Sequence, residues 1–212
     1  TIARKLAHEI KNPLTPIQLT IDNLRSKYLN EVKDENKHKF ELNLKTINNQ
    51  INQIENLVNE FSDFARMPKP VYKDNDLKDV ILLNIELLKK VDKEINFNFN
   101  SEKSFRFKFD YEQISRVCFN LFKNSIESLI EKCKKTPNSV KNIDIEIVEH
   151  IDYISLSIID TGLGFKNINI SELTKPYFTT KTDGTGLGLS IVSKIINDHN
   201  GIITFVNLKD GA

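Results

Sequence analysis

Two long amphipathic stripes in the first third of the chain place the strongest constraint on its fold. Apolar residues recur at intervals of three and four, first within residues 1–28 and then from residue 40 onward. The members are Leu6, Ile10, Leu14, Ile17, Ile21 and Leu24, followed by Phe40, Leu44, Ile47, Ile51, Ile54, Val58, Phe61 and Phe64. This spacing lines up one face of an α-helix. A polar turn over residues 30–37 separates the stripes, so the sequence predicts two long helices in an antiparallel hairpin.

The predicted hairpin has an apolar face that its two helices alone cannot cover. A second copy of the chain would complete a four-helix bundle, so we predict a homodimer. The alternative is that the hairpin packs against the rest of its own chain. Pro13 is expected to bend the first helix just after His8.

A polar stretch broken by prolines, residues 67–76, follows the second stripe and predicts a linker. It separates an all-α domain over residues 1–66 from a second domain over residues 77–212. Periodicity in the second domain predicts helices at residues 77–91, 111–132 and 185–198. It also predicts short strands at residues 95–99, 105–109, 143–148, 154–159 and 202–206. Helices interleaved with alternating strands indicate an α+β sandwich, with helices on one face of the sheet and water on the other.

Composition excludes several classes of protein. The formal net charge is only +1 and basic residues are interleaved with acidic ones, so nucleic-acid binding is not expected. No apolar run is long enough to span a membrane, and we expect a soluble stretch without direct membrane contact. Cys118 and Cys133 form no disulfide or zinc pattern, which favours reduced thiols in the cytoplasm. The chain starts inside a helical stripe and stops where a further strand is expected, which indicates a fragment.

The first candidate for chemistry is His8, which is followed by Glu9 and, one helical turn later, by Asn12. A neutral imidazole on an exposed helix face is nucleophilic, and Glu9 could orient it or take its proton, so the group predicts a phosphohistidine. The zinc-protease helix His-Glu-x-x-His requires a second imidazole where this chain has Asn12, so zinc hydrolysis is disfavoured. The alternative for a single helical histidine is a residue without chemistry.

Two further groups of residues suit a magnesium nucleotide. Asn120 and Asn124 lie one turn apart on a predicted helix, and their amide oxygens suit Mg²⁺ that takes its other ligands from phosphates. Asp160 ends an apolar strand just before Gly162 and Gly164, where its carboxylate could accept a hydrogen bond from the amine of adenine. The alternatives are ordinary polar residues on a wet helix face and a common Asp-x-Gly turn.

A glycine-rich run near the end of the chain adds a phosphate site. Glycines alternate with Thr185 and Leu187 at Gly184, Gly186 and Gly188. Such a run lets backbone N–H groups approach a phosphate chain, and a helix beginning at Thr185 would add its positive dipole end. The spacing matches neither Walker A, nor the dinucleotide fingerprint, nor a protein-kinase loop. The loop before it, residues 165–183, predicts a nucleotide lid. Lys181 and the hydroxyls of Thr179 and Thr180 would lie near the phosphates, and Phe178 would be the apolar latch of the lid.

In this order the motifs resemble the catalytic half of bacterial sensor histidine kinases. Residues 8–13 are similar to the phosphoacceptor box of these kinases, and residues 120–124 are similar to the N box. Residues 160–164 and 184–188 are similar to the first and second glycine boxes, and residues 175–181 are similar to the F box. The extended stretch over residues 12–19 resembles the nitrogen-sensing NtrY-type subgroup.

The resemblance implies a dimerising phosphotransfer hairpin joined to an ATP-binding domain of the GHKL type, shared by gyrase, a heat-shock chaperone, histidine kinases and MutL. It implies that Mg-ATP phosphorylates His8 and that the phosphoryl group passes to an aspartate on the receiver domain of a response regulator, in two-component signal transduction. It also implies dephosphorylation of the regulator, with Asn12 placing the water. The full-length protein is then expected to be anchored in the bacterial inner membrane, with this fragment in the cytoplasm.

Two departures and two rival hypotheses accompany the resemblance. Ser125 stands where the N box usually has alanine, and the ATP-binding domain is expected to be incomplete at its C-terminal end. One rival is a degenerate module that docks a regulator without turnover, but Asn124, Asp160 and the glycines are all present. The other rival is a different ATPase of the same nucleotide fold, which has no need of His8 on a helical hairpin.

Overall fold

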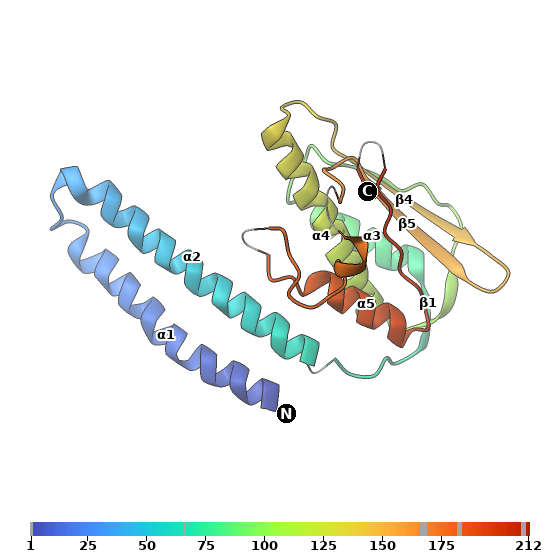
Figure 1. Cartoon of the computed structure of the whole chain (residues 1–212), viewed down its shortest axis with the longest axis horizontal. Helices are drawn as coiled ribbons and strands as arrows, with labels where there is room; N and C mark the ends of the chain where they lie inside the picture. The colour runs from blue at the N-terminus through green and yellow to red at the C-terminus, as the bar shows by residue number, and fades with distance from the viewer. Residues whose placement is uncertain (1, 66, 166–168, 182–183, 209–210) are drawn as a thin grey trace. The chain divides into compact units, whose positions relative to one another are not determined.

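The computed structural model describes residues 2–65, 67–165, 169–181, 184–208 and 211–212 (Figure 1). It divides the chain into two compact units. The first is Thr1–Pro68 together with Thr180–Leu187, and the second is Lys69–Thr179 together with Gly188–Ala212.

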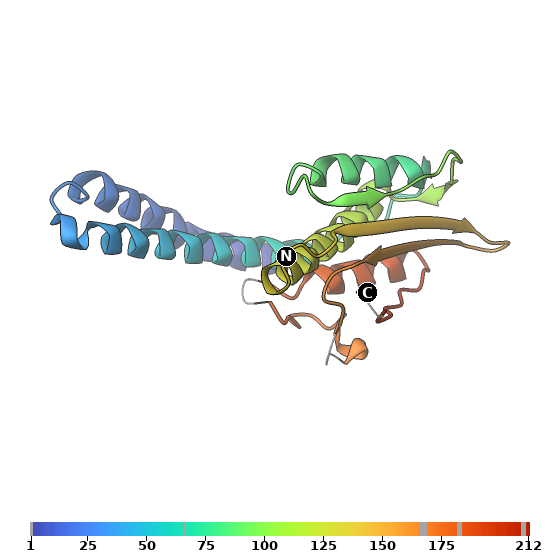
Figure 2. The same cartoon turned by 90° about the horizontal axis from the view of Figure 1, so that it is seen from above.

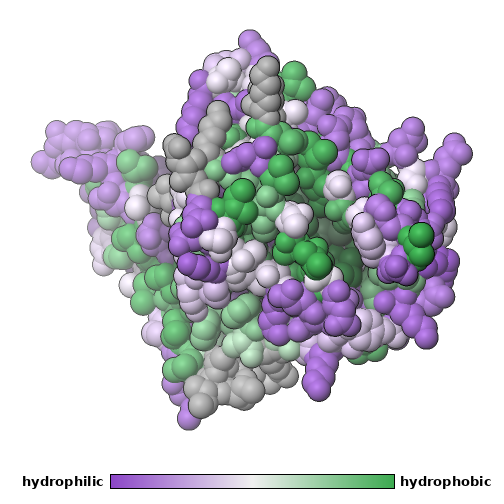
Figure 3. All heavy atoms as spheres, turned by 45° about the vertical axis from the view of Figure 1, so that its right-hand side comes forward, coloured by the Kyte–Doolittle hydropathy of each residue, from purple (hydrophilic) through white to green (hydrophobic). Residues whose placement is uncertain are grey.

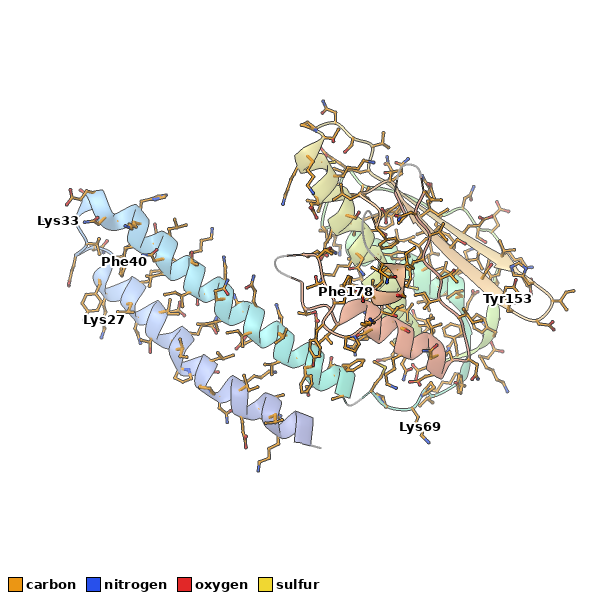
Figure 4. All side chains as sticks on the ribbon, in the orientation of Figure 1. Lys27, Lys33, Phe40, Lys69, Tyr153 and Phe178 are labelled. Carbon is orange, nitrogen blue, oxygen red and sulfur yellow. The ribbon has the colours of Figure 1, made fainter. Side chains whose placement is uncertain are left out.

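The first unit contains the predicted hairpin, formed by α1 (Ile2–Tyr28) and α2 (Asp34–Ala65). Its core joins buried residues from both stripes, namely Leu14, Ile21, Leu44 and Ile51. Phe40 packs against this cluster near the turn between the helices (Figure 4). Basic residues occupy the last turn of α1 and acidic residues the first turn of α2, as the helix dipoles favour. The hairpin therefore forms for the reasons that the sequence predicts, and α1 runs without interruption through Pro13 and Pro16.

A second part of the stripes stays at the surface of the hairpin. Ile10, Ile17, Ile47 and Ile54 each keep 43–45% of their surface exposed in the single chain. Within the described part of the chain, no helix combines the length with the apolar character that crossing a membrane requires.

The second unit is built from two small sheets and the helices beside them. Its helices are α3 (Leu77–Leu88), α4 (Tyr111–Lys135), the short 3-10 helix η1 (Ile170–Glu172) and α5 (Gly188–Asp198). Its strands are β1 (Lys73–Asp76), β2 (Asn96–Asn98), β3 (Arg106–Phe109), β4 (Asn142–Glu149) and β5 (Ile154–Asp160). β4 is the central strand of the larger sheet, parallel to β2 and antiparallel to β5, while β1 pairs with β3. Figure 2 shows β4 and β5 running side by side past the ends of α3 and α5.

The larger sheet has one apolar face and one polar face. Ile143 and Ile145 are buried, whereas Asp144 and Glu146 between them are exposed. α4 contacts α3, α5 and both strands of the β4–β5 hairpin. Its fully buried Phe122 meets Phe97 of β2 edge to face at 6.0 Å between ring centroids. The predicted α+β sandwich, with helices on one face of the sheet, is confirmed.

The structure adds a strand that the sequence analysis missed. Residues 73–76 were expected to belong to the linker, but they form β1, because their backbone pairs with β3. Asp76 at its end caps α3, accepting the backbone N–H groups of Lys78 and Phe105 at 3.0 Å each. Burial raises the pKa of the Asp76 carboxyl, but hydrogen bonds from Ser104, Phe105 and Lys78 outweigh it and lower the pKa.

The end of the second unit differs from the expectation in two ways. The helix predicted from Thr185 begins at Gly188 instead, because Gly186 has a φ of 70°, which a right-handed helix does not allow. The strand predicted over residues 202–206 is absent from the described residues. Asn207 instead bonds both the N–H and the carbonyl of Phe165, at 2.6 and 3.3 Å. Ile202 is left 90% exposed. Figure 3 shows hydrophobic side chains around a hollow on the face of the molecule that is turned toward the viewer.

The last residues before β1 are held by other segments of the second unit. Val71 donates its N–H to the Asp110 carboxylate at 2.7 Å, and the Tyr72 hydroxyl donates to the carbonyl of Asp198 at 2.7 Å. The backbone N–H of Asp110 in turn donates to Nε2 of His199 at 3.1 Å. Burial raises the pKa of the Asp110 carboxyl, but the hydrogen bonds from Val71 and Gln113 outweigh it and hold the pKa below its ordinary value. The start of α4 and the end of α5 therefore anchor this segment.

Candidate active site

The predicted phosphoacceptor group lies on the surface of α1. His8, Glu9 and Asn12 are all exposed, whereas Ala7 beside them is buried. Glu9 lies 3.9 Å from Lys5, and both side chains are largely exposed, so this ion pair contributes little to stability. An imidazole in this setting is open to a phosphate donor that approaches from solvent.

The asparagine pair lies on α4, where this helix meets the start of α5. The side-chain amide of Asn120 donates from Nδ2 to the carbonyl of Arg116 at 3.0 Å. Its oxygen Oδ1 faces Gly188, since a Cβ placed on that glycine would lie 3.5 Å from Oδ1. Asn124 follows one turn later on α4 and is half-buried. Because Nδ2 is engaged by the helix itself, Asn120 presents an oxygen to the start of α5, and oxygen is the ligand that Mg²⁺ prefers.

Backbone N–H groups gather at the same place. α5 begins at Gly188, and the first N–H groups of a helix have no partner within the helix. Gly186, with its positive φ, and the fully buried Leu187 lead into this helix. The arrangement suits an anion near Asn120, since the N–H groups of the first helical turn and the helix dipole both favour negative charge there.

The predicted adenine-binding carboxylate belongs to the last residue of β5, just before a tight turn. Asp160 is buried and its Oδ1 accepts the backbone N–H of Gly162 at 2.9 Å. Gly162 has no room for a side chain, because a Cβ there would lie 2.6 Å from that same oxygen and 2.8 Å from Cβ of Ser128. Gly164 has a φ of 66°, which favours glycine. The turn therefore presents a buried carboxylate in one fixed direction.

Residues of the predicted lid belong to both units. Phe178 lies on the connection between η1 and α5, and its N–H donates to the carbonyl of Lys175 at 3.2 Å (Figure 4). Phe178 and Thr179 belong to the second unit, whereas the stretch from Thr180 to Leu187 belongs to the first. Residues 166–168 and 182–183 of the predicted lid lie outside the described residues.

Within the first unit, Thr185 contacts α2 as well as its own loop. Its hydroxyl donates to the carboxylate of Glu60 and lies 3.3 Å from the N–H of Leu187. Gly184 is exposed and Gly186 is half-buried in the same loop.

The structure adds two residues that the sequence analysis did not single out. Ser128 accepts the backbone N–H of Leu163 through its hydroxyl at 2.9 Å, and Lys132 donates to the carbonyl of Thr161 at 2.6 Å. Both lie on α4 and both hold the turn that follows Asp160. Ser128 and Lys132 follow Asn124 at intervals of four residues, and this spacing is the signal in the sequence that could have found them.

Comparison with known protein families agrees with this arrangement. Residues 1–70 match the His Kinase A (phospho-acceptor) domain, and residues 109–211 match the histidine kinase-, DNA gyrase B-, and HSP90-like ATPase. The chain belongs to the histidine kinases. Its phosphoacceptor domain thus covers the α1–α2 hairpin, and its ATPase domain covers α4, the β4–β5 hairpin and α5.

Relatives of this histidine kinase are similar over nearly its whole length. A Rickettsia felis protein described as an NtrY-like sensor histidine kinase is 38% identical over 210 residues, which are 99% of this chain and 34% of the relative. The nitrogen regulation protein NtrY of Azorhizobium caulinodans is 35% identical over 210 residues, which are 99% of this chain and 27% of that protein. The predicted resemblance to NtrY-type kinases is confirmed. The chain spans about a third of the length of the Rickettsia felis relative and about a quarter of that of the Azorhizobium caulinodans relative.

Solved histidine kinases share the fold. The catalytic domain of histidine kinase ThkA is 27% identical, with a TM-score of 0.57 over 66% of this chain and 90% of that one. ThkA in complex with the response regulator protein TrrA gives a TM-score of 0.66 over 99% of this chain and 58% of the ThkA chain, at 23% identity. The second likeness shows a common fold over both domains.

Proposed function

We propose that this chain is the core of an ATP-dependent protein-histidine kinase that phosphorylates itself on His8. The observation that carries the proposal is the position of α4 in the second unit. One helix presents the Asn120 amide oxygen at the start of α5 and supports, through Ser128, the turn that holds Asp160. These contacts support a proposed phosphate site and a proposed adenine site along a single helix. Such an arrangement suits a nucleotide that extends from one end of this helix face to the other.

In this proposal Asp160 selects the base and the other end of the site holds the phosphates. The buried carboxylate accepts a hydrogen bond from the amine of adenine, which guanine lacks at that position. Asn120 and Asn124 supply neutral oxygen ligands to Mg²⁺, and the N–H groups of the glycine run and of α5 face the phosphates. Mg²⁺, when bound, neutralises charge on the phosphate oxygens. The side chains of Phe178, Thr179, Thr180 and Lys181 close over the nucleotide.

His8 acts as the nucleophile. One ring nitrogen attacks the γ-phosphorus of ATP in line, a nitrogen–phosphorus bond forms, and the bond to the leaving oxygen of ADP breaks. Glu9 accepts the proton of the other ring nitrogen, so that the phosphorylated ring is neutral. Exposure of His8 on α1 supports this role, because the reaction requires the hairpin and a nucleotide-loaded second unit to approach one another.

The phosphoryl group then passes to an aspartate on the receiver domain of a response regulator. The structure of ThkA with TrrA supports a partner of this kind, since ThkA shares the fold over both domains. Asn12, one turn after His8 and also exposed, places a water for dephosphorylation of the regulator. The whole protein, like other sensor kinases, is anchored in the bacterial inner membrane through segments outside this chain.

Labelled nucleotide tests the proposed function directly. The chain is incubated with γ-labelled Mg-ATP, freed of nucleotide, and mixed with receiver domains from the same organism. We expect acid-labile label on the chain that moves to one receiver domain within minutes. The same receiver domain with its acceptor aspartate replaced by alanine is the control and should take up no label. A chain that binds ATP but never becomes labelled would contradict the proposal and favour a docking module without turnover.

We further propose that the chain is a homodimer through its hairpin. The isoleucines that remain 43–45% exposed, Ile10, Ile17, Ile47 and Ile54, continue the stripes whose inner part is already buried. Burying them against a second hairpin removes apolar surface from water at about 25 cal/mol per Å². Sedimentation equilibrium should give twice the chain mass, and Ile17→Glu with Ile54→Glu should give the monomer. The control pair, Glu9→Lys with Glu35→Lys, changes charge at exposed positions of the hairpin that lie outside the apolar stripes. A parent chain that stays monomeric at micromolar concentration would overturn the dimer.

A further inference from the structure

A row of polar side chains runs along one face of α4 and continues beyond the N box. Asn120, Asn124, Ser128 and Lys132 follow one another at intervals of four residues, so each lies about 6 Å further along the same face. The two asparagines are accounted for by the proposed magnesium site. Ser128 and Lys132 have no role in that site, and both contact the turn after β5.

Ser128 is the support on which this turn rests. Its hydroxyl accepts the backbone N–H of Leu163 at 2.9 Å. Gly162 lies so close that any Cβ there would overlap the Ser128 hydroxyl and reach within 2.8 Å of its Cβ. The peptide between Gly162 and Leu163 is therefore held by a hydrogen bond and by direct packing against the same side chain.

The rest of the turn is held from both sides. Lys132 donates to the carbonyl of Thr161 at 2.6 Å from α4. Thr161 also donates its N–H to the carbonyl of Asn142 at 3.1 Å, which attaches it to β4. Its hydroxyl accepts the N–H of Asn142 at 3.1 Å and donates to the carbonyl of Val140 at 2.7 Å. The turn thus has little freedom except at the Gly162–Leu163 peptide, which depends on Ser128.

The direction of the Asp160 carboxylate depends on that same peptide. Oδ1 of Asp160 accepts the N–H of Gly162 at 2.9 Å, so a shift of Gly162 turns the carboxylate. We propose that Ser128 is a positioning residue for nucleotide selection: it aligns the Asp160 carboxylate with adenine by fixing the turn, and Lys132 assists it. The inference rests on the proposed function, because that function assigns the base to Asp160.

Loss of the Ser128 hydroxyl should therefore lower the affinity for ADP and reduce the preference for adenine over guanine. In Ser128→Ala the N–H of Leu163 loses its acceptor, and the Gly162–Leu163 peptide is free to move. Loss of one such bond at a partly buried donor corresponds to about a tenfold loss of affinity for ADP. GDP affinity should change much less, because guanine does not use the aligned carboxylate in this way. The chemistry at His8 is not touched.

The experiment compares the whole parent chain with Ser128→Ala and with the control Ser157→Ala, whose serine lies exposed on the polar face of β5. Calorimetry gives the Kd values for ADP and GDP, and autophosphorylation gives KM for ATP and kcat separately. For Ser128→Ala we expect the Kd for ADP and the KM for ATP to rise about tenfold. We expect kcat to stay within about twofold of the parent value, and the ratio of the Kd for GDP to the Kd for ADP to become smaller than in the parent. Ser157→Ala should match the parent in all four values.

Other outcomes overturn the inference. Values for Ser128→Ala that match Ser157→Ala would show that the turn does not depend on the hydroxyl. An equal loss of ADP and GDP affinity together with a lowered Tm of the nucleotide-free chain would show a general structural role instead. If Ser128→Ala does not fold, Lys132→Met must narrow the preference for ADP in the same direction, and a parent-like preference would overturn the inference. A parent chain that binds neither nucleotide would instead overturn the proposed function itself.

Discussion

His8→Gln is expected to take up no acid-labile phosphate from γ-labelled ATP while binding ADP as tightly as the parent chain. Glutamine has a size and polarity close to those of histidine, but its amide nitrogen is not nucleophilic, so no bond to phosphorus forms. The fold should be unaffected, because the His8 side chain is exposed on α1. Phosphorylation should therefore fall below detection, with the Kd for ADP unchanged.

Another exposed histidine of the hairpin, His38, provides the control for this variant. His38→Gln changes an exposed residue on α2 of the same hairpin and should be labelled like the parent. Calorimetry with ADP on each variant separates loss of chemistry from loss of binding. Acid-labile label that persists in His8→Gln would show that another residue is the acceptor.

Asp160→Asn is expected to weaken ADP binding by about a hundredfold. Two effects act together, since the charge-assisted bond to the adenine amine is lost and the new amide can place a donor opposite a donor. A loss of this kind corresponds to about 2.7 kcal/mol. The fold should survive, because the asparagine oxygen can still accept the N–H of Gly162 that Asp160 accepts at 2.9 Å.

A matched aspartate shows whether the effect is local. Asp152→Asn removes the same charge from an exposed position in the turn between β4 and β5, at the other end of β5 from Asp160. Calorimetry with ADP should give the parent value for this control, and the melting temperatures of both nucleotide-free variants should stay within a few degrees of the parent. Unchanged ADP affinity in Asp160→Asn would remove the base-recognition role from this carboxylate.

Much of the fold could be predicted from patterns that local physics enforces. The two stripes place apolar residues on one face of each helix whatever the rest of the chain does, and α1 and α2 form as expected. The alternation of Ile143 and Ile145 with Asp144 and Glu146 likewise sorts β4 into a buried and an exposed face. Both patterns are periodic, and a period can be seen in one sequence.

The two segments that differ from the prediction are those in which backbone contacts rather than side chains decide the structure. β1 is polar throughout and shows no alternation, and it exists because β3 offers backbone partners from a distant part of the chain. Residues 202–206 are all β-branched or aromatic, yet in the described residues this segment forms no ladder, since Asn207 attaches the chain to Phe165 instead. The pattern of apolar residues in a sequence indicates burial, but it does not show whether a partner strand is within reach.

The site divides in the same way. The residue types and spacings of His8, Asn120, Asp160 and the glycine run were sufficient to predict a magnesium nucleotide and a histidine acceptor, because few chemistries need that set. Only the tertiary structure decided that α4 presents Asn120 to the start of α5 and supports the Asp160 turn through Ser128. A hydroxyl that accepts one N–H from a residue 35 positions away leaves no periodic trace, because such a contact depends on where the folded backbone brings two segments together.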